Sequence, residues 1–471
     1  MPHTQCLKGP TRARLPAWPP RTALPRAMRV ATFIAICLAG LALLAPPPLH
    51  AQNNGVAPGE EGDPAQDIIV EGLGFSKLIL ALEADANLTD KDEFRTAAPL
   101  LEQDLCWSGV FNLTGGQSRY CQIKGKPQRI DMRLHASLEG GAMMLRLYDT
   151  GPENLLLFAE GLPMADLAKV REDRVPMMAL INRLTARITG HEGLLGSSIG
   201  FVLRQPGFAK VIVTTSTHGD KLRLLSSNRD INILPRFRPG GVGLVYTILG
   251  RKGTQVFYQS LDPKGNGSVE STFLTLPGSL NSGGAFSPDG MNLVFTMSVN
   301  HNADLFILNL QDKKPRQLTN RQGIETQAHW SPDGKSLLFV SDRSGTPQIY
   351  LLDMDTNDEL RLTFESTYNA DPKWSPDGKR ILFTRRVNMI DQIHIMDRFG
   401  ENVRMVTRGR YFSEQAEWSP DGRQVVFASN RTGEYKLYIV STDGTNLRRL
   451  TRTPKRFEEN SPTWTSRHLV R

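Results

Sequence analysis

The hydrophobic and polar positions in the second half of the chain repeat with a period of 44 residues. The tetrapeptide Ser-Pro-Asp-Gly begins at Ser287, Ser331, Ser375 and Ser419. An aromatic residue precedes each copy, and a β-rich run such as Leu337-Leu-Phe-Val340 follows it; the four aromatic residues are Phe286, Trp330, Trp374 and Trp418. A fixed period of this length is the signature of a repeat architecture.

Two weaker copies flank these four and bring the number of repeats to six. Phe237-Arg-Pro-Gly-Gly241 lies upstream, and Ser461-Pro-Thr-Trp464 ends the array. Each period divides into four short strands, and Pro-Asp-Gly supplies a turn because Pro fixes φ and Gly permits unusual backbone angles. Four strands every 40 to 50 residues are typical of a propeller blade.

The two ends of the array predict how the propeller closes. The first unit offers three strands, beginning at Ile199, Lys210 and Lys221, and the last copy around Trp464 offers one strand alone. Pairing them gives a 1+3 blade that closes a ring. A β-sandwich has no reason for a strict period, and an open solenoid would leave unpaired edges. The predicted fold is mainly β: a six-bladed β-propeller over residues 193–471, closed by the C-terminal strand and preceded by a smaller α/β domain.

Residues 68–192 have the mixed pattern of that α/β domain. An amphipathic run covers 96–107, β-type runs cover 130–138, 143–147 and 155–158, and helical spacing from Met177 to Ile188 ends at Gly190.

Residues 1–51 read as a leader with a secretory signal. Arg29 precedes the apolar stretch 30–45, prolines follow it, and cleavage is expected after Ala51. The alternative is an uncleaved membrane anchor, although the stretch is short for a bilayer span. Residues 1–27 are either an extended leader or precede a true start at Met28. The polar segment 52–67 is predicted to be a flexible arm.

Charge and cysteines narrow the functional classes. The net charge of +8 falls to +2 without residues 1–51, which hold six basic and no acidic residues. Nucleic-acid binding therefore loses its compositional support. Cys106 and Cys121 remain in the mature chain and can form a disulfide in an oxidising compartment. Two buried free thiols are the alternative, and no metal-ligand spacing is present.

The sequence offers little for catalysis. Gly196-Ser-Ser198-Ile-Gly200 matches G-x-S-x-G, but a nucleophile elbow needs a strand before the serine and a helix after it, and here the order is reversed. His301, His329 and His394 occupy different strand positions, so convergence on a metal is not expected. We predict a non-enzyme without catalytic residues, metal or other cofactor.

The candidate binding residues lie four and five positions before each repeat aromatic, where one blade crosses to the next. Crossing segments gather at one mouth of the channel, which is where a propeller usually binds its partner. An equally weighted alternative is that these positions are turn residues whose side chains only satisfy backbone hydrogen-bonding groups. The predicted set, extended by Gly283, is Asn281, Ser282, Gly283, Glu325, Thr326, Asn369, Ser413, Glu414, Glu459 and Asn460.

The mature chain resembles the TolB family, the periplasmic component of the Tol-Pal system of Gram-negative bacteria. The resemblance rests on the Trp-Ser-Pro-Asp-Gly copies and on four further segments: 342–350, 461–464, Asp104-Leu-Cys-Trp-Ser-Gly-Val-Phe111 and Leu147-Tyr-Asp-Thr-Gly151. The junction 184–201 is similar in kind.

The resemblance implies a periplasmic, monomeric scaffold that supports outer-membrane integrity and envelope constriction during cell division. It implies that Pal, the peptidoglycan-associated lipoprotein, binds at the channel mouth at residues 281–283 and Thr326, and that TolA binds the segment 52–71. Three features depart from the family: a longer and more acidic arm, the apolar Leu280, and the cysteine pair. The alternative function is a secreted propeller enzyme or a carbohydrate- or small-ligand-binding protein.

Overall fold

The computed structural model describes residues 77–114, 121, 127, 129–205, 210–226, 228, 230–250, 253–261, 271–275 and 280–469. The predicted signal peptide, its cleavage site and the arm lie outside these residues. Within the described ranges, no helix is long and apolar enough to cross a membrane.

The first domain is a five-stranded mixed sheet with helices, in strand order β2-β1-β3-β4-β5. β1 runs parallel to both β2 and β3, and the remaining pairs are antiparallel. The strands are β1 (Leu78–Ala84), β2 (Phe111–Thr114), β3 (Met132–Glu139), β4 (Ala142–Asp149) and β5 (Leu156–Pro163). The helices are α2 (Ala86–Thr89), α3 (Asp92–Trp107), α4 (Met164–Ala168) and α5 (Val175–Thr189).

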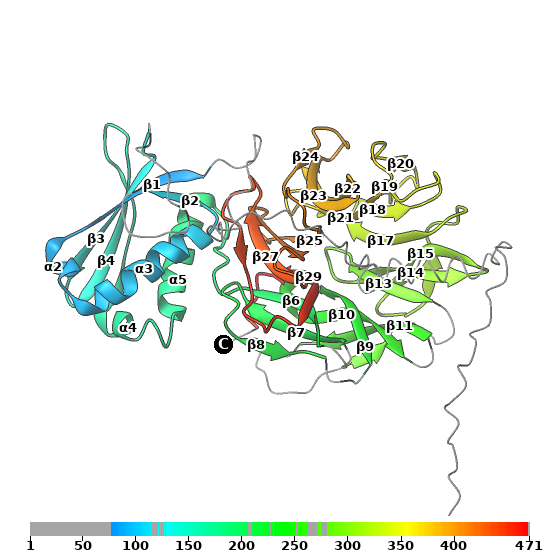
Figure 1. Cartoon of the computed structure of the whole chain (residues 1–471), viewed down its shortest axis with the longest axis horizontal. Helices are drawn as coiled ribbons and strands as arrows, with labels where there is room; N and C mark the ends of the chain where they lie inside the picture. Colours follow the sequence, from blue (N-terminus) through cyan, green and yellow to red (C-terminus); the bar gives the residue numbers. More distant parts are fainter. Residues whose placement is uncertain are drawn as a thin grey trace, which may run out of the picture. The chain divides into compact units, whose positions relative to one another are not determined.

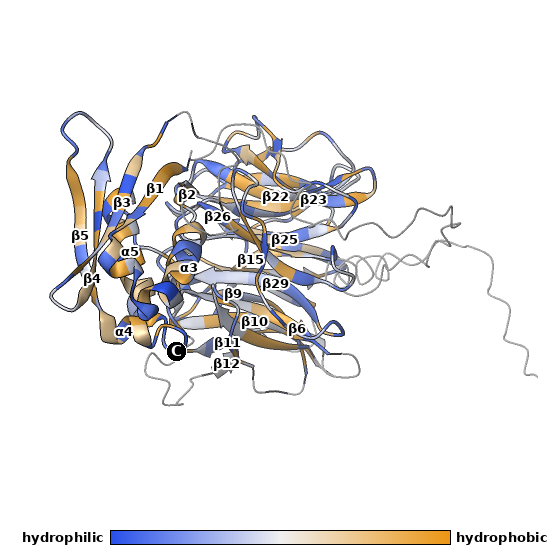
Figure 2. Cartoon of the chain, turned by 60° about the vertical axis from the view of Figure 1, so that its left-hand side comes forward, coloured by the Kyte–Doolittle hydropathy of each residue, from blue (hydrophilic) through white to orange (hydrophobic). Residues whose placement is uncertain are grey.

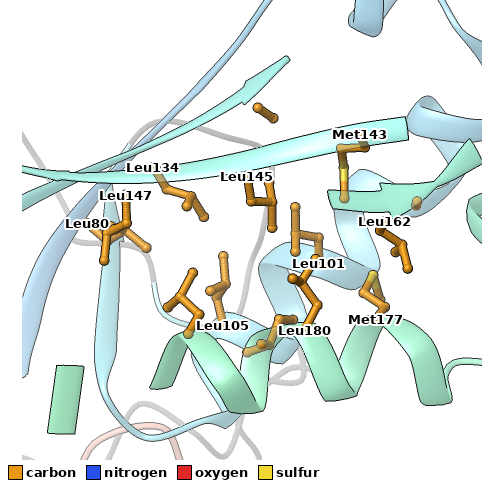
Figure 3. Close-up of a cluster of buried hydrophobic side chains, with 14 of the residues drawn as sticks. Leu80, Leu101, Leu105, Leu134, Met143, Leu145, Leu147, Leu162, Met177 and Leu180 are labelled. Carbon is orange, nitrogen blue, oxygen red and sulfur yellow. The ribbon is translucent and has the colours of Figure 1, made fainter. Parts of the chain in front are cut away.

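The core of this domain lies between the sheet and the helices α3 and α5 (Figure 3). Leu105, Leu145 and Leu180 are fully enclosed there. Alternate residues of β4 face this core, and α5 turns an apolar stripe towards it before Gly190 ends the helix in the left-handed conformation. A disulfide joins Cys106 at the end of α3 to Cys121, the pairing predicted from the sequence.

Six four-stranded antiparallel sheets form the propeller, and the predicted fold class is confirmed. Five are consecutive along the chain. Blade one has β9 (Ile231–Phe237), β10 (Gly243–Gly250), β11 (Gly253–Ser260) and β12 (Ser271–Phe273), with the 3-10 turn η2 (Pro239–Gly241). Blade two has β13 (Asn281–Phe286), β14 (Asn292–Val299), β15 (Asn302–Asn309) and β16 (Pro315–Gln317).

The next three consecutive blades repeat this plan. Blade three has β17 (Glu325–Trp330), β18 (Ser336–Ser341), β19 (Gln348–Asp353) and β20 (Glu359–Arg361). Blade four has β21 (Asn369–Trp374), β22 (Arg380–Val387), β23 (Ile390–Asp397) and β24 (Arg404–Met405). Blade five has β25 (Ser413–Trp418), β26 (Gln424–Ser429), β27 (Lys436–Ser441) and β28 (Arg448–Arg449).

Blade six joins the two ends of the propeller segment. Its strand order is β29-β6-β7-β8, and β29 (Glu458–Thr465) pairs antiparallel with β6 (Ser198–Arg204). Figure 1 shows this last strand, in red, beside the green β6. The others are β7 (Lys210–Ser216) and β8 (Leu222–Leu224). The inner strands β9, β13, β17, β21, β25 and β29 each contact the inner strand of both neighbouring blades, so the ring is closed.

The repeated motif explains why the blades form. In blade three, the Ser331 hydroxyl donates to Asp333 at 2.6 Å and accepts from the Ser336 amide at 2.9 Å, while Gly334 supplies the positive φ of +71°. Trp330 packs against the apolar residues of blade two and donates its indole N–H to the Ala285 carbonyl at 3.2 Å. Hydrophobic residues lie along the strands of the blades and of the first sheet in Figure 2. The motif thus closes one turn and joins two blades.

Candidate partner-binding face

The segments that cross from one blade to the next lie on the same face as the hairpins between the second and third strands. The Ile324 amide donates to Asp342 at 2.7 Å, the Ser366 hydroxyl to the Arg386 carbonyl at 2.7 Å, and the Phe412 amide to Asn430 at 2.9 Å. We call this the crossing face: for blades two to five it comprises the crossing segments 319–324, 363–368, 407–412 and 450–457 with the hairpin turns 300–301, 342–347, 388–389 and 430–435.

The predicted binding residues lie near the beginning of the inner strands, next to the crossing face and not within it, and most of their side chains are enclosed. Gly283 and Glu414 are half-buried. Asn281, Glu325, Asn369, Ser413, Glu459 and Asn460 are each at most 2% exposed, while Ser282 and Thr326 are 5% and 8% exposed. Whether the set contacts a partner stays a prediction.

In three of the five predicted pairs, the first residue bonds to the third strand of the preceding blade. The Asn281 amide donates to Thr254 in β11 at 2.9 Å. Asn369 donates to Gln348 in β19 at 2.9 Å, and Glu459 accepts the Leu437 amide of β27 at 2.9 Å. Buried polar groups need such partners, because an unsatisfied one costs about 1–3 kcal/mol. These residues therefore hold adjacent blades together.

Glu325 is the centre of a buried charged cluster between blades two and three. It accepts from the Ser341 hydroxyl at 2.7 Å and from the Arg343 guanidinium at 3.1 Å. Burial, together with the neighbouring Asp304, raises the pKa of Glu325 to about 7. Arg343 also pairs with Glu359 and stacks over Tyr350 at 4.8 Å, so its charge is engaged within the protein.

Glu414 has the most perturbed acidic group of the predicted set. Burial raises its pKa to about 8, and the negative charges of Asp391 and Asp371 add to the effect. A hydrogen bond with Tyr435 and the charge of Arg386 oppose it. The side chain can therefore hold a proton near neutral pH.

The residues directly before the repeat aromatics form a ring of inner-strand positions. Arg236 lies 3.9 Å from Glu417, whereas Lys373 is 2% exposed and donates a hydrogen bond to the Pro372 carbonyl at 3.4 Å. Burial lowers the pKa of Lys373 to about 8 and holds the pKa of His329 well below its usual range. The neutral His329 ring accepts the Trp374 amide at 3.2 Å.

The other residues singled out for chemistry have structural partners. Ser198 of G-x-S-x-G is fully buried and accepts the Leu469 amide at 2.7 Å, so it anchors the end of the chain. His301 lies in an exposed turn at φ +65°, and His394 bonds the Gln392 carbonyl. Among the described residues, no group of three or more His, Cys, Asp or Glu could hold a metal ion.

Sequence reasoning missed the exposed side chains of the crossing face. Phe364, Met389 and Tyr411 are 72%, 77% and 46% exposed. Arg408 and Arg410 are also exposed and precede Tyr411 in the segment Thr407-Arg-Gly-Arg-Tyr-Phe412. Comparing the crossing segments of successive repeats would have revealed this basic and aromatic character, because the segments are equivalent by position.

A second polar cluster links the first domain to the propeller. Asp104 in α3 is fully buried and accepts from Arg174 at 2.7 and 2.9 Å and from His218 of the propeller at 2.8 Å. Arg448 of β28 stacks over Trp107 at 4.1 Å, and burial lowers its pKa to about 9. A separate pocket of about 520 Å³ lies within the first domain, between α3 and the sheet, and has a mainly apolar lining.

Comparison with known proteins identifies the family. The profile described as "TolB beta propeller domain" matches residues 185–468, more than half of the chain. The chain belongs to the TolB family. The family predicted from the sequence is thereby confirmed.

Individual TolB proteins resemble the chain over much of its length. The chain is 28% identical over 321 residues to "Tol-Pal system protein TolB" of Anaeromyxobacter sp. (strain K), which is 63% of this chain and 67% of the relative. It is 28% identical over 219 residues to "Protein TolB homolog" of Chlorobium luteolum, a match that covers 39% of this chain and 46% of the relative. The crystal structure of TolB from Acinetobacter baumannii matches with a TM-score of 0.64 at 26% identity, over 83% of this chain and 96% of that one.

Proposed function

We propose that this chain is a non-enzymatic scaffold of a Tol-Pal system, exported to the periplasm, where it binds a Pal-like lipoprotein and a TolA-like inner-membrane protein. Membership of the TolB family carries this proposal, because the related proteins are named as Tol-Pal components. The corresponding cellular role is to support outer-membrane integrity and envelope constriction during cell division. The chain is proposed to act as a monomer.

The closed ring supports a binding function. Its inner strands contact one another around the whole ring, and the side chains singled out for chemistry are tied to structural partners. Such a body offers its crossing face to a partner, as propellers generally do at the mouth of the channel. The Pal-binding site is proposed at this face, near residues 281–283 and Thr326, and the TolA-binding site in segment 52–71.

A direct binding measurement tests the proposal. The mature chain is titrated by calorimetry with the purified soluble domain of the Pal-like lipoprotein from the same organism, and separately with the C-terminal domain of its TolA-like protein. Saturable 1:1 binding of the lipoprotein domain is expected. Deleting residues 52–71 should abolish TolA binding and leave lipoprotein binding unchanged. Lack of any lipoprotein binding, together with a sugar or other small ligand that raises the melting temperature, would refute the scaffold function.

A further inference from the structure

In blades two to five, the loops on the two faces of the propeller carry opposite net charge. In blades two to five the crossing face has eight basic and three acidic residues: Arg321, Arg343, Arg408, Arg410, Arg431, Arg452, Lys455 and Arg456, with Asp342, Glu365 and Glu434. The turns of the opposite face, at 287–291, 310–314, 331–335, 354–358, 375–379, 398–403, 419–423 and 442–447, have six basic and nine acidic residues. The positive charge is therefore concentrated on the crossing face, although the mature chain is nearly neutral.

Most of this positive charge is free to meet a partner. Arg408, Arg410, Arg452 and Lys455 are exposed and form no ion pair with any residue that the structure describes. Arg321 approaches Glu359 only to 3.9 Å, with 66% of its side chain exposed. Charges left in water in this way attract an oppositely charged surface and accelerate its association.

Exposed apolar side chains accompany the charge and identify the partner as a protein. Phe364, Met389 and Tyr411 come from three neighbouring loops around blade four, and Arg361 stacks over Phe364 at 4.8 Å. Aromatic residues, Met and Arg are the types enriched at the centres of protein interfaces. A polyanion such as a nucleic acid would use the arginines but would leave Met389 without a role.

We propose that the crossing face around blades four and five binds an acidic protein surface, with Phe364, Met389 and Tyr411 as apolar anchors and Arg408, Arg410 and Arg452 as the charges that meet carboxylates. This inference rests on the proposed function, since the partner meant is the Pal-like lipoprotein. It assigns the contact to exposed loop residues around blades four and five, whereas the sequence indicated only the residues at the beginning of the inner strands there.

A charge-reversal series tests the inference. The variant Arg408→Glu/Arg410→Glu/Arg452→Glu is compared with Lys313→Glu/Lys314→Glu/Lys379→Glu, which reverses the same number of exposed charges on the opposite face. Affinity for the lipoprotein domain is measured at 50 and 300 mM NaCl. The first variant should bind at least tenfold more weakly at low salt and lose most of its salt dependence, and the second should remain within twofold of wild type. Melting temperatures check that both fold.

An apolar variant and a polyanion control make the outcome decisive. Phe364→Ser/Met389→Ser should weaken lipoprotein binding at least tenfold at both salt concentrations, because it removes anchors and no charge. Undiminished lipoprotein binding by both the charge-reversed and the apolar variants would overturn this inference and leave the proposed function intact. Failure of the wild-type protein to bind the lipoprotein domain would refute both this inference and the proposed function. Loss of heparin binding by the charge-reversed variant, with lipoprotein binding unchanged, would assign the face to a polyanion instead.

Discussion

The joint at which the propeller closes should be its weakest point, and two equivalent tryptophans allow this to be measured. Trp464 in β29 and Trp330 in β17 occupy the same repeat position, are both 8% exposed, and both donate an indole hydrogen bond: Trp464 to Ser197 at 2.8 Å and Trp330 to Ala285 at 3.2 Å. Substitution of a buried tryptophan by alanine costs about 3–5 kcal/mol. Trp464→Ala and Trp330→Ala should therefore lower global stability to a similar extent.

The two variants should differ in how they open. β17 continues along the chain into β18, its partner in the same blade, whereas β29 is held to blade six by its pairing with β6, far earlier in the sequence, and by packing against Ile199 and Phe201. Loss of Trp464 should let β29 detach while the other blades stay folded, since a strand that short loops do not connect to its own blade opens locally at low cost.

Native-state hydrogen exchange of the β29 and β6 amides measures this opening. In Trp464→Ala the exchange of these amides without denaturant should accelerate at least tenfold more than that of the β17 amides in Trp330→Ala, which exchange only when the whole protein unfolds. Equal acceleration in both variants would refute the claim that the ring closes at its weakest joint.

Three further predictions follow from particular contacts. Cys106→Ser should lower the free energy of unfolding by about 3 kcal/mol, the value for a loop of 15 residues in the chain-entropy model. The melting temperature of the reduced wild-type protein should equal that of this variant. Asp104→Asn should cost about 3–5 kcal/mol because it removes the buried carboxylate shared by Arg174 and His218; Asp92→Asn, at an exposed ion pair, should stay within about 0.5 kcal/mol, and equal melting temperatures would contradict this. Burial raises the pKa of Glu414 from 4.5 to about 8, so folding favours the protonated carboxyl; the resulting stability is present below pH 4.5 and lost as pH rises through about 8. The melting temperature of Glu414→Gln relative to wild type should therefore increase between pH 5 and pH 9, and a constant difference would exclude the raised pKa.

The propeller was predictable because each blade repeats the same physical solution. The β-type run Leu337-Leu-Phe-Val340 lies within β18 (Ser336–Ser341), and the strands predicted to begin at Ile199 and Lys210 became β6 and β7. The first domain was harder. β1 was not predicted, although the apolar run Leu78-Ile-Leu-Ala-Leu82 could have indicated a buried strand, and the four- and five-residue helices α2 and α4 are too short for a helical period.

The candidate site was only partly predictable. Polar residues at the crossings were identified, but a polar residue at the start of an inner strand has the same pattern whether it faces water or the preceding blade. Asn369 and Glu459 face the preceding blade and are buried. Their environment depends on contacts between blades, which no local pattern contains. Exposed residues such as Arg408 and Tyr411 fall in short loops without periodicity. Only the closed ring shows that they lie together on the crossing face.

The hydrogen bonds and charged contacts between adjacent blades also specify which blade packs beside which. Four blades with almost the same motif could in principle pair with the wrong neighbour, which is a characteristic failure of repeat proteins. The boundaries differ chemically: Asn281 meets Thr254, Glu325 meets Asp304, Asn369 meets Gln348, and Glu459 meets Leu437 and Thr451. A misplaced blade would bury a carboxylate or an amide without its partner, so these enclosed side chains act against misassembly during folding.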